Sequence, residues 1–449
     1  MKTHLLYTFC IGLSLFSCEK EISIEDAAKL KATFPKLEAE IPASDHRMGP
    51  AGAKRGICTL FQIDQMPLFL GEGVSWCYNW GHNPLPDDKQ DLLDQMGMTY
   101  IPMVWSGTAR ADHLIVHQQN GCGYVLGFNE PNLMDQAKLT PQQAAKLWKD
   151  LIATAKSLQL KVVGPAVNYG TLPGYGDPTV WYDEFLAQPE VSIDDIDAIA
   201  VHAYMNSGNA VKQLMIRKFA KYGKPLWLTE FANGEARTAA QQAEFMQEAV
   251  TYLEADPAVE RYAWFMDTIT YPEAPHFPLV TGPQLGTSPS AQVTELGILY
   301  TYLSTFDKQT FYPVDHNIPA ESYSGQVAEE SAPQSAWGPM VHTRITSDML
   351  GNLEIYDLAP DGWVEYNIDI PKTGKYRLDL RYSTSQDVIL TGVFPGAPDG
   401  VFQLPSTGNG QWLTAGFELP LNAGKQTIRL KPLQGTLALN WLRFTSPKK

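Results

Sequence analysis

The segment YVLGFNEPN (residues 124–132) is the strongest indication of the fold in the sequence. It opens with the apolar run Tyr124–Phe128, which has the length of a buried strand, and then turns at Glu130 and Pro131. A second segment, LWLTEF (226–231), follows the same plan and places Glu230 after an apolar run. In an α/β barrel the carboxyl ends of the strands form the mouth of the active site, so both acids are expected there.

The chain around these two segments alternates short apolar runs with helical patterns from about residue 53 to 305. Thr140–Gln143 is a capping box with proline at the first helical position, and a helix-spaced apolar face follows it. This alternation predicts a parallel sheet covered by helices, and its length of about 250 residues fits a (β/α)8 TIM barrel. Seven strands are predicted, at Val74–Tyr78, Thr99–Val104, Tyr124–Phe128, Lys161–Gly164, Ala198–Ala203, Leu226–Thr229 and Tyr262–Met266. The eighth strand is expected either near Gly56–Phe61 or between Trp105 and Tyr124.

The last third of the chain has a different period. Val364, Tyr366, Ile368 and Ile370 alternate with polar residues, and turn sequences separate further runs of this kind. Period-2 strands without helices predict an all-β sandwich, jelly-roll-like in type. We therefore expect a barrel over residues 53–305, a linker over 306–318 and a sandwich over 319–446.

The N-terminus has the features of an exported protein. An apolar run from Leu5 to Phe16 follows one lysine and ends at Ser17-Cys18. This ending resembles a bacterial lipobox, which implies a signal peptide over 1–17, lipid attachment at Cys18 and a tether over 18–52. A plain signal peptide with an incidental cysteine is the alternative. We expect an exported protein, periplasmic or on the cell surface, whose only membrane contact is its lipid anchor.

The net charge argues against a nucleic-acid partner, and the cysteine content argues against a disulfide framework. The 449 residues include 34 Lys and Arg against 49 Asp and Glu, and the net charge of −15 would repel a phosphate backbone. We therefore expect no nucleic-acid partner. Beyond Cys18 only Cys58, Cys77 and Cys122 remain, too few for a disulfide framework, although one bridge is compatible with them. No cofactor-binding motif is present, and no cofactor is predicted.

Glu130 and Glu230 are the candidate catalytic residues. Glycoside hydrolysis needs one carboxylic acid to protonate the leaving oxygen and one carboxylate to attack the anomeric carbon. About three βα units separate the two glutamates, so opposite strands of a barrel can direct both into one cleft. The structural alternative is that each caps a helix or pairs with an arginine.

Six ordered segments of the chain resemble glycoside hydrolase family 128, a family of retaining endo-β-1,3-glucanases with a barrel fold. The segments are GVSWCYNWG (73–81), PMVW (102–105), GFNEPN (127–132), IDAIAVHAY (196–204), PLWLTEF (225–231) and ERYAWF (260–265). The resemblance implies that Glu130 is the acid/base and Glu230 the nucleophile. It also implies that Asn129 hydrogen-bonds the 2-hydroxyl group of the sugar at the cleavage point.

Aromatic residues at strand ends are candidates for sugar contacts, because sugar rings present C–H faces that stack on aromatic rings. The predicted substrate-binding residues are Asn129, Tyr78, Trp105, His202, Tyr204 and Trp264. Trp76 and Trp80 belong to the same set of strand-end aromatics. For each aromatic residue, packing in the barrel core is the alternative, and a structural hydrogen bond is the alternative for His202.

The C-terminal segments AESY (320–323), GWVEY (362–366), GKYRL (374–378) and LNWLRF (439–444) resemble carbohydrate-binding module family 6. The resemblance implies a jelly-roll sandwich and, near Glu321, a structural calcium ion. Ala415 stands where that family commonly has a ligand-stacking aromatic, and Tyr356 is one place off the expected tyrosine. A supporting sandwich and a glycan-binding one therefore both remain open.

Together these patterns predict a retaining, endo-acting hydrolase of β-1,3-glucan of the laminarin or curdlan type. The expected partner is this polysaccharide or its oligosaccharides. The alternatives are a related β-glycanase acting on β-1,4-mannan or xylan, and a non-catalytic surface protein that binds glycans.

Overall fold

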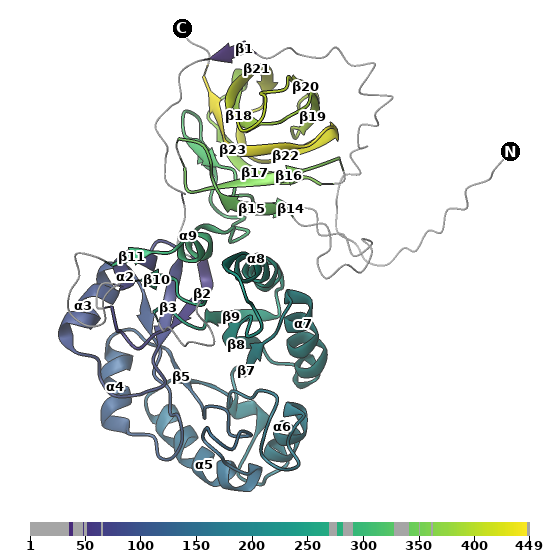
Figure 1. Ribbon diagram of the computed structural model, residues 1–449. Helices are drawn as coiled ribbons and strands as arrows, with labels where there is room; N and C mark the ends of the chain where they lie inside the picture. The colour runs from purple at the N-terminus through teal and green to yellow at the C-terminus, as the bar shows by residue number, and fades with distance from the viewer. Residues whose placement is uncertain are drawn as a thin grey trace, which may run out of the picture.

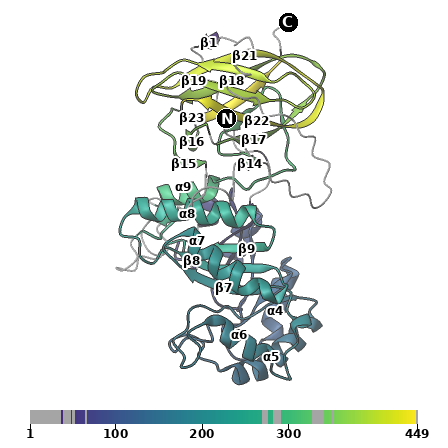
Figure 2. The ribbon, with the colours of Figure 1, turned by 90° about the vertical axis from the view of Figure 1, so that its right-hand side faces the viewer.

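The computed structural model of the chain has an α/β part followed by a β-rich part (Figure 1, Figure 2). The structure describes residues 36–38, 48, 52–63, 66–268, 276–281, 291–326, 341–349, 351–360 and 362–446. The predicted signal peptide (1–17), Cys18 and most of the predicted tether (18–52) lie outside the described residues. Within the described residues, no helix combines the length and the apolar character needed to cross a bilayer.

The α/β part is built from parallel strands that each lead into a helix. The strands are β2 (Gly52–Cys58), β3 (Val74–Tyr78), β4 (Thr99–Tyr100), β5 (Tyr124–Leu126), β6 (Lys161–Val163), β7 (Ile199–Tyr204), β8 (Leu226–Ala232) and β9 (Val259–Trp264). The helices that follow them are α2 (Met66–Leu70), α3 (Asp87–Gln95), α4 (Ala111–Gln119), α5 (Pro141–Ser157), α6 (Pro178–Leu186), α7 (Gly208–Lys212), α8 (Ala239–Ala255) and α9 (Glu295–Tyr302).

These strands pair in two sheets. Six strands run in the order β4-β3-β2-β9-β8-β7, and β5 pairs with β6. Single parallel bridges join the two sheets on both sides, from Met103 to Leu126 and from Val163 to Ala198. The eighth strand, for which the sequence left two positions open, is β2, whereas the segment between Trp105 and Tyr124 forms α4.

The helix predicted from its capping box begins as expected. The Thr140 side chain accepts a hydrogen bond from the Gln143 backbone, and the Gln143 side chain accepts one from the Thr140 backbone. Pro141 occupies the first helical position, where no backbone donor is needed. Residues spaced three or four apart then form the buried face of α5, namely Ala144, Ala145, Trp148, Leu151, Ile152 and Ala155.

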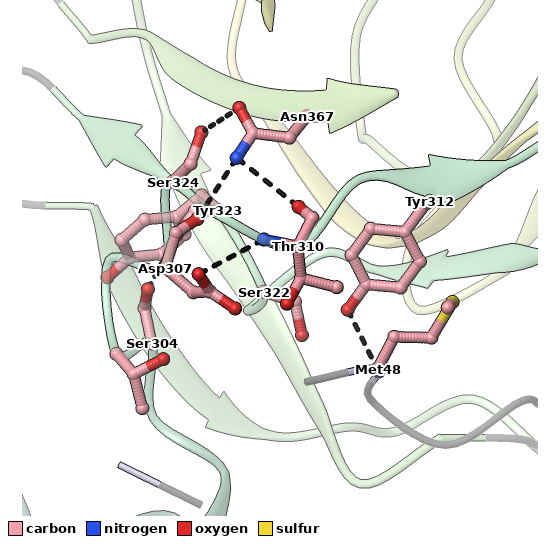
Figure 3. Close-up of a pocket in the computed structure, with 10 residues that line it drawn as sticks. Met48, Ser304, Asp307, Thr310, Tyr312, Ser322, Tyr323, Ser324 and Asn367 are labelled. Carbon is pink, nitrogen blue, oxygen red and sulfur yellow. Dashed lines mark hydrogen bonds between the residues drawn. The ribbon is translucent and has the colours of Figure 1, made fainter. Parts of the chain in front are cut away.

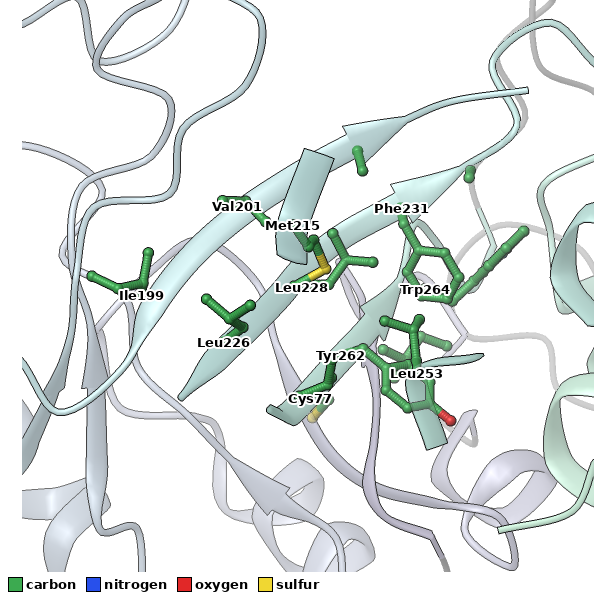
Figure 4. Packing of buried hydrophobic residues seen from close by; sticks show 14 of the residues in the cluster. Cys77, Ile199, Val201, Met215, Leu226, Leu228, Phe231, Leu253, Tyr262 and Trp264 are labelled. Carbon is green, nitrogen blue, oxygen red and sulfur yellow. The ribbon is translucent and has the colours of Figure 1, made fainter. Parts of the chain in front are cut away.

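Alternation along the strands divides the core into two faces. Ile199, Val201, Leu226 and Leu228 face the helices, together with Trp264 (Figure 4). The intervening residues of the same strands form a second cluster on the opposite face, with Trp76, Tyr78, Ala200, Trp227 and Ala263 among them. Gly56 is required at one close approach, because a Cβ atom there would lie 2.2 Å from the Trp76 ring. Residues at the ends of the second face are therefore the ones that can reach the mouth of the sheet.

The C-terminal part is a sandwich of two mainly antiparallel sheets. One has the order β1-β21-β18-β23-β16-β15 with β13 beside β23, and the other has the order β12-β17-β22-β19-β20 with β14 beside β17. Its strands are β12 (Tyr312–Pro313), β13 (Asn317–Pro319), β14 (Gly325–Gln326), β15 (His342–Ile345), β16 (Leu353–Leu358), β17 (Val364–Ile370), β18 (Gly374–Ser383), β19 (Val388–Val393), β20 (Gly400–Leu404), β21 (Leu413–Leu421), β22 (Gly424–Gln434) and β23 (Leu437–Thr445). The alternating residues Val364, Tyr366, Ile368 and Ile370 are buried in its core, as their period predicts.

Two segments outside the predicted sandwich pair with it. β1 (Lys36–Glu38), from the predicted tether, pairs antiparallel with β21. β12, from the predicted linker, pairs with β17, and β13 pairs with β23 across the end of that linker. The sandwich therefore takes up strands that lie before residue 319.

Hydrogen bonds fix the sandwich on the α/β part. The Thr343 backbone in β15 donates to Gln247 Oε1 of α8 at 2.8 Å, and Ser304 Oγ donates to the Tyr323 carbonyl at 2.6 Å. Asn367 Nδ2 donates to the Asp307 carbonyl at 3.1 Å, beside a cavity of about 10 Å³ at the junction (Figure 3). This volume holds about one water molecule, so the junction is closely packed.

Candidate active site

An irregularity in β8 directs Glu230 toward the face of the sheet that lies opposite the helices. Val201 pairs with Leu228 and His202 with Glu230, so Thr229 is an extra residue between the two pairs. Such a bulge changes the direction of the side chain that follows it. The Thr229 carbonyl, which the bulge frees from the ladder, accepts hydrogen bonds from Cys58 Sγ at 3.2 Å and from Tyr78 Oη at 3.0 Å. Hydrogen bonds from β2 and β3 therefore fix the backbone beside Glu230, the candidate nucleophile.

Glu130 has a left-handed backbone with a φ of 43°. This conformation is costly for a residue with a Cβ atom and is held by its surroundings. The Glu130 amide donates to the Ala166 carbonyl at 2.8 Å, and the Glu130 carbonyl accepts from the Leu133 amide at 3.0 Å. The turn after β5 therefore fixes the side chain beside β6 and β7.

The two glutamates meet at His202. Its Nδ1 atom lies 2.9 Å from Glu130 Oε1 and 3.3 Å from Glu230 Oε2. One oxygen of each carboxyl group and one ring nitrogen lie within 4.8 Å of one another. The two carboxyl groups, one hundred positions apart in the chain, therefore face the same point.

Glu230 is surrounded by donors. Its Oε1 accepts from Trp80 Nε1 at 2.7 Å and lies 3.3 Å from Tyr78 Oη, and its Oε2 accepts from Tyr204 Oη at 2.5 Å. Because an indole N–H can only donate, Oε1 has to act as an acceptor. These hydrogen bonds favour the ionised carboxylate, which is the form that can attack a carbon atom, and they oppose the effect of burial on the same group.

Glu130 has an unequal pair of oxygens. Oε1 receives the contact from His202 and a hydrogen bond from Asn168 Nδ2 at 3.2 Å. No hydrogen bond from any residue that the structure describes reaches Oε2. This oxygen is therefore the one that can carry a proton toward a ligand.

Burial and hydrogen bonds act against each other in both carboxyl groups. Burial raises the pKa of Glu230, and the nearby Glu130 raises it further, although His202, Tyr204 and Trp80 oppose this. Burial also acts on Glu130, but hydrogen bonds from His202 and Asn168 outweigh it and lower the pKa of Glu130. Burial disfavours the charged form of His202, yet the two carboxylates outweigh it and raise the pKa of the imidazole. Since these groups interact directly, protons are taken up by the cluster as a unit.

A cavity of about 510 Å³ opens in front of the carboxyl groups. Glu130 and Glu230 line it together with aromatic, apolar and amide side chains, namely Leu60, Trp80, Trp105, Asn129, Leu133, Gln136, Asn168, Tyr204, Phe265 and Met266. A concave site with apolar walls and a few converging polar groups is typical of ligand-binding sites in proteins. Its mixture of rings and amides suits an uncharged, hydroxylated ligand.

Residues 59–300, more than half of the chain, match the family model described as the glycosyl hydrolase catalytic core. The chain belongs to this glycosyl hydrolase family. Among curated proteins, it is 30% identical over 214 residues to alkali-sensitive linkage protein 1 of Schizosaccharomyces pombe. The match covers 44% of this chain and 35% of that protein, so the chain spans about a third of that relative.

Solved structures give a likeness over the same part of the glycosyl hydrolase. A glycoside hydrolase family 128 (subgroup II) endo-β-1,3-glucanase from Pseudomonas viridiflava is 34% identical, with 56% of this chain and 98% of that chain covered and a TM-score of 0.50. The corresponding subgroup II enzyme from Sorangium cellulosum is 33% identical, with 55% and 97% covered and a TM-score of 0.49.

The C-terminal sandwich of this glycosyl hydrolase matches a different module from the one expected. Residues 339–444 match the model of carbohydrate binding module family 35. The expected resemblance to family 6 is thereby corrected. The two assignments share a β-sandwich, so strand patterning alone does not separate them.

The predicted sugar contacts of the glycosyl hydrolase fall into three groups. Trp105 and Tyr204 line the cavity, and so does Asn129, whose Nδ2 donates to Gln136 Oε1 at 3.2 Å. Tyr78 and His202 are fully buried and do not line the cavity. Tyr78 contacts the carboxyl group of Glu230, and His202 contacts that of Glu130.

Trp264 lies apart from the other predicted contacts and requires a correction. It is fully buried on the helix-facing side of β9, and its Nε1 donates to the Phe277 carbonyl at 2.9 Å. Phe265, the next residue, lines the cavity instead. The strand pattern was predicted correctly, but its face was assigned in the wrong register.

Several cavity residues escaped prediction. Asn168 follows the end of β6, and a polar residue at that position was a usable indication. Trp80 was only one of several strand-end aromatics, and nothing in the sequence showed that it would contact Glu230. Leu60, Leu133, Gln136 and Met266 lie in turns beyond the strands, where no periodic pattern applies.

Among the described residues, Glu130, His202 and Glu230 are the only group of three acidic, cysteine or histidine side chains close enough to share a metal ion. Their facing atoms already make hydrogen bonds with one another and with Trp80, Tyr204 and Asn168, so we assign them no metal-binding role. Glu321 is buried but belongs to no such group, and the calcium ion near it stays a prediction. Cys58, Cys77 and Cys122 are buried free thiols.

Proposed function

We propose that this protein hydrolyses internal bonds of β-1,3-glucan and that the reaction retains the configuration of the anomeric carbon. The observation that carries the proposal is the approach of the two carboxyl groups to within 4.8 Å across the cavity. Retaining glycosidases hold their carboxyl groups about 5–5.5 Å apart, whereas inverting enzymes hold them about 6.5–9.5 Å apart. The choice of β-1,3-glucan is supported by the likeness to the Pseudomonas viridiflava endo-β-1,3-glucanase.

The first step forms a covalent intermediate. In the form of the enzyme whose proton resides on Glu130 Oε2, a carboxylate oxygen of Glu230 attacks the anomeric carbon, and Glu130 transfers that proton to the glycosidic oxygen as that bond breaks. Because His202 and Asn168 lower the pKa of Glu130 while burial raises that of Glu230, this form is the minor one in the free protein. The products of this step are a glycosyl ester on Glu230 and a departing glucan with a new hydroxyl group. Glu130 is left as a carboxylate, which His202 and Asn168 stabilise through Oε1.

The second step returns the enzyme to its starting state. Glu130 accepts a proton from water, the water oxygen attacks the anomeric carbon, and Glu230 leaves as a carboxylate. Two displacements at one carbon restore the original configuration. Tyr204 and Trp80 donate to Glu230 as it regains its charge.

We further propose that the α/β part is a closed (β/α)8 barrel. The support is that β2 pairs with both β3 and β9, while isolated bridges connect Met103, just after β4, to β5 and connect β6 to Ala198, just before β7. Closure places the ends of β5 and β8 across one mouth, as a site built from Glu130 and Glu230 requires.

We also propose that the sandwich binds glycan and that the protein is exported and lipid-anchored at Cys18. The match to carbohydrate binding module family 35 supports the first point. The apolar run before Ser17-Cys18 supports the second.

The test is the release of reducing ends from laminarin, curdlan, β-1,4-mannan and xylan by the full chain. We expect a mixture of oligosaccharides from the β-1,3-glucans, loss of release in Glu230→Gln, and retained release in the control Glu235→Gln. Glu235 is an exposed acid near the end of β8 that does not line the cavity. Equal release by wild type and Glu230→Gln would overturn the mechanism. Release from mannan or xylan alone would reassign the substrate, and binding without release would indicate a glycan-binding protein.

A further inference from the structure

Trp80 has a backbone conformation that a large side chain rarely adopts. Its φ is 62°, in the left-handed region, just beyond the end of β3. Both neighbours are fixed, because Asn79 Oδ1 accepts hydrogen bonds from the Gly81 amide and from Tyr100 Oη. Tyr100 Oη also lies 2.9 Å from the Gly81 carbonyl. The turn is thus held on either side of a strained residue, a pattern that clusters at functional sites.

The strained backbone directs the Trp80 indole ring into the cavity. Its ring lies 5.4 Å from that of Tyr78 and 5.8 Å from that of Phe265, centroid to centroid. These contacts hold the ring while Nε1 donates to Glu230 Oε1 at 2.7 Å. The distance is short for an N–H donor, as expected when the acceptor is charged.

Neutral donors take the place of a cation at Glu230. Among the described residues, no lysine or arginine forms an ion pair with this carboxylate, and its charged neighbour is His202. Arg55, the buried arginine of β2, pairs with Glu254 instead. Uncharged donors, Trp80 and Tyr204, therefore add to the effect of His202 in stabilising the charge on the carboxylate.

We propose that Trp80 is a positioning residue whose indole N–H orients Glu230 and keeps Oε1 an acceptor, so that the other oxygen attacks. This inference rests on the proposed role of Glu230 as nucleophile. Tyrosine hydroxyls can donate or accept, so Tyr204 and Tyr78 alone would tolerate a protonated Glu230. Trp80 cannot accept a hydrogen bond, so it excludes a proton from Oε1, and its N–H bonds more strongly to the charged carboxylate than to the neutral acid.

The pH dependence of Glu230 involves every titratable group that faces it. These groups are His202 and Tyr204 from β7, Glu130 after β5, Tyr78 from β3 and Cys58 from β2. None of them changes in a Trp80→Phe variant, which keeps an aromatic ring and removes the N–H donor together with part of the ring. A second Trp→Phe change in the same cavity controls for the smaller ring.

The experiment compares Trp80→Phe with the control Trp105→Phe, in which a second cavity tryptophan without a hydrogen bond to either carboxylate is changed. We expect Trp80→Phe to lower kcat by about 10- to 100-fold on a laminari-oligosaccharide, as for loss of one hydrogen bond to a charged group. The acidic limb of its kcat/KM profile should move to higher pH. Trp105→Phe should mainly raise KM and leave that limb in place.

A second measurement separates this inference from the proposed function. Infrared difference spectra recorded during pH titration report the ionisation of Glu230 without turnover, and Glu230→Gln identifies its band. If the protein cleaves no β-1,3-glucan, the proposed function fails, but a higher pH for this band in Trp80→Phe would still support the inference. An unchanged band or an unchanged acidic limb would overturn it. If Trp80→Phe fails to fold, 3-benzothienylalanine at position 80 keeps the bicyclic shape without the N–H and serves the same comparison.

Discussion

Glu130 and Glu230 approach each other to within 4.8 Å, although one follows β5 and the other lies in β8. A bulge at Thr229 precedes Glu230, and Glu130 has a left-handed backbone. Inverting enzymes hold their carboxyl groups about 6.5–9.5 Å apart to leave room for the attacking water. The shorter separation here fits the proposed reaction with retention of configuration.

The first prediction is that the initial product has the β configuration at its new reducing end. Proton NMR of the anomeric signals during the first minutes, before mutarotation, measures this directly. A β-anomer that appears first and then equilibrates is expected from two displacements. An α-anomer appearing first would show a single displacement and would contradict the proposed role of Glu230.

The second prediction concerns the different roles of the two glutamates. Glu130→Ala should lower kcat on polymer by about 10²- to 10⁴-fold, because it removes general acid–base catalysis. The loss should be much smaller for formation of the intermediate from an aryl glycoside with a good leaving group. Added azide should then give the β-glycosyl azide with Glu130→Ala and the α-glycosyl azide with Glu230→Ala. Identical azide products from both variants would refute the assignment.

The third prediction concerns His202, which contacts both carboxyl groups. Its interactions lower the pKa of Glu130 and oppose the rise in the pKa of Glu230. Removing the imidazole in His202→Ala should therefore raise both values and move both limbs of the kcat/KM profile to higher pH. The control is His113→Gln, a change in α4 outside the cavity. A profile that only falls in height would show that His202 has a purely structural role.

Apolar periodicity was enough to predict most strands and the two segments that carry Glu130 and Glu230. Glu130 follows β5, as expected, whereas β8 continues to Ala232, so Glu230 lies inside its strand and not after it. The catalytic roles of the two glutamates stay a prediction. The face of a strand end is harder to assign, because neighbouring aromatic residues such as Trp264 and Phe265 fit either side of the sheet. Tyr262 and Trp264 lie in the helix-facing cluster and Ala263 in the opposite one, so regular alternation places Phe265 in the cavity.

The position of β2 was uncertain in the sequence because a charged residue lies in the middle of this strand. Arg55 interrupts the apolar pattern of β2, yet it is fully buried and paired with Glu254 at 2.9 Å. A sequence pattern does not show a partner 199 residues away. The contact of Trp80 with Glu230 is equally non-local, and it depends on a left-handed turn that no propensity predicts.

The fourth prediction concerns the Arg55–Glu254 pair and the end of α9. Besides Glu254, the guanidinium donates to the carbonyls of Tyr300, Leu303 and Ser304, where the chain leaves the α/β part for the sandwich. Arg55→Met should lower the free energy of unfolding by about 3–5 kcal/mol, because it leaves a buried carboxylate and several carbonyls unpaired. Urea unfolding of the full chain measures this loss.

The double variant provides the control for that pair. Arg55→Met combined with Glu254→Gln removes both charges, so it should recover part of the stability lost in the single variant. If the double variant loses more free energy of unfolding than the two single variants lose together, the charge-pair explanation is contradicted.

The fifth prediction concerns Asp267, a fully buried carboxyl group that follows the end of β9. Its oxygens accept hydrogen bonds from Thr59 Oγ1 at 2.6 Å and from Thr268 Oγ1 at 3.2 Å, but burial outweighs these and raises its pKa from 3.8 to about 6. Between these two values the native state binds more protons than the unfolded state, so stability falls as the pH rises from about 4 to about 6. At 1.36 kcal/mol for each pH unit, the loss amounts to roughly 3 kcal/mol.

Asp267→Asn keeps the shape and the acceptor oxygen but cannot ionise, so it should lack this loss. Relative to wild type, the variant should gain roughly 2–3 kcal/mol in the free energy of unfolding between pH 4 and pH 7. Urea unfolding at pH 4, 5, 6 and 7 measures the difference, and the exposed Asp88→Asn serves as the control. Parallel pH curves for Asp267→Asn and wild type would show that Asp267 ionises in the folded protein at its ordinary pH, and that the hydrogen bonds from Thr59 and Thr268 offset its burial.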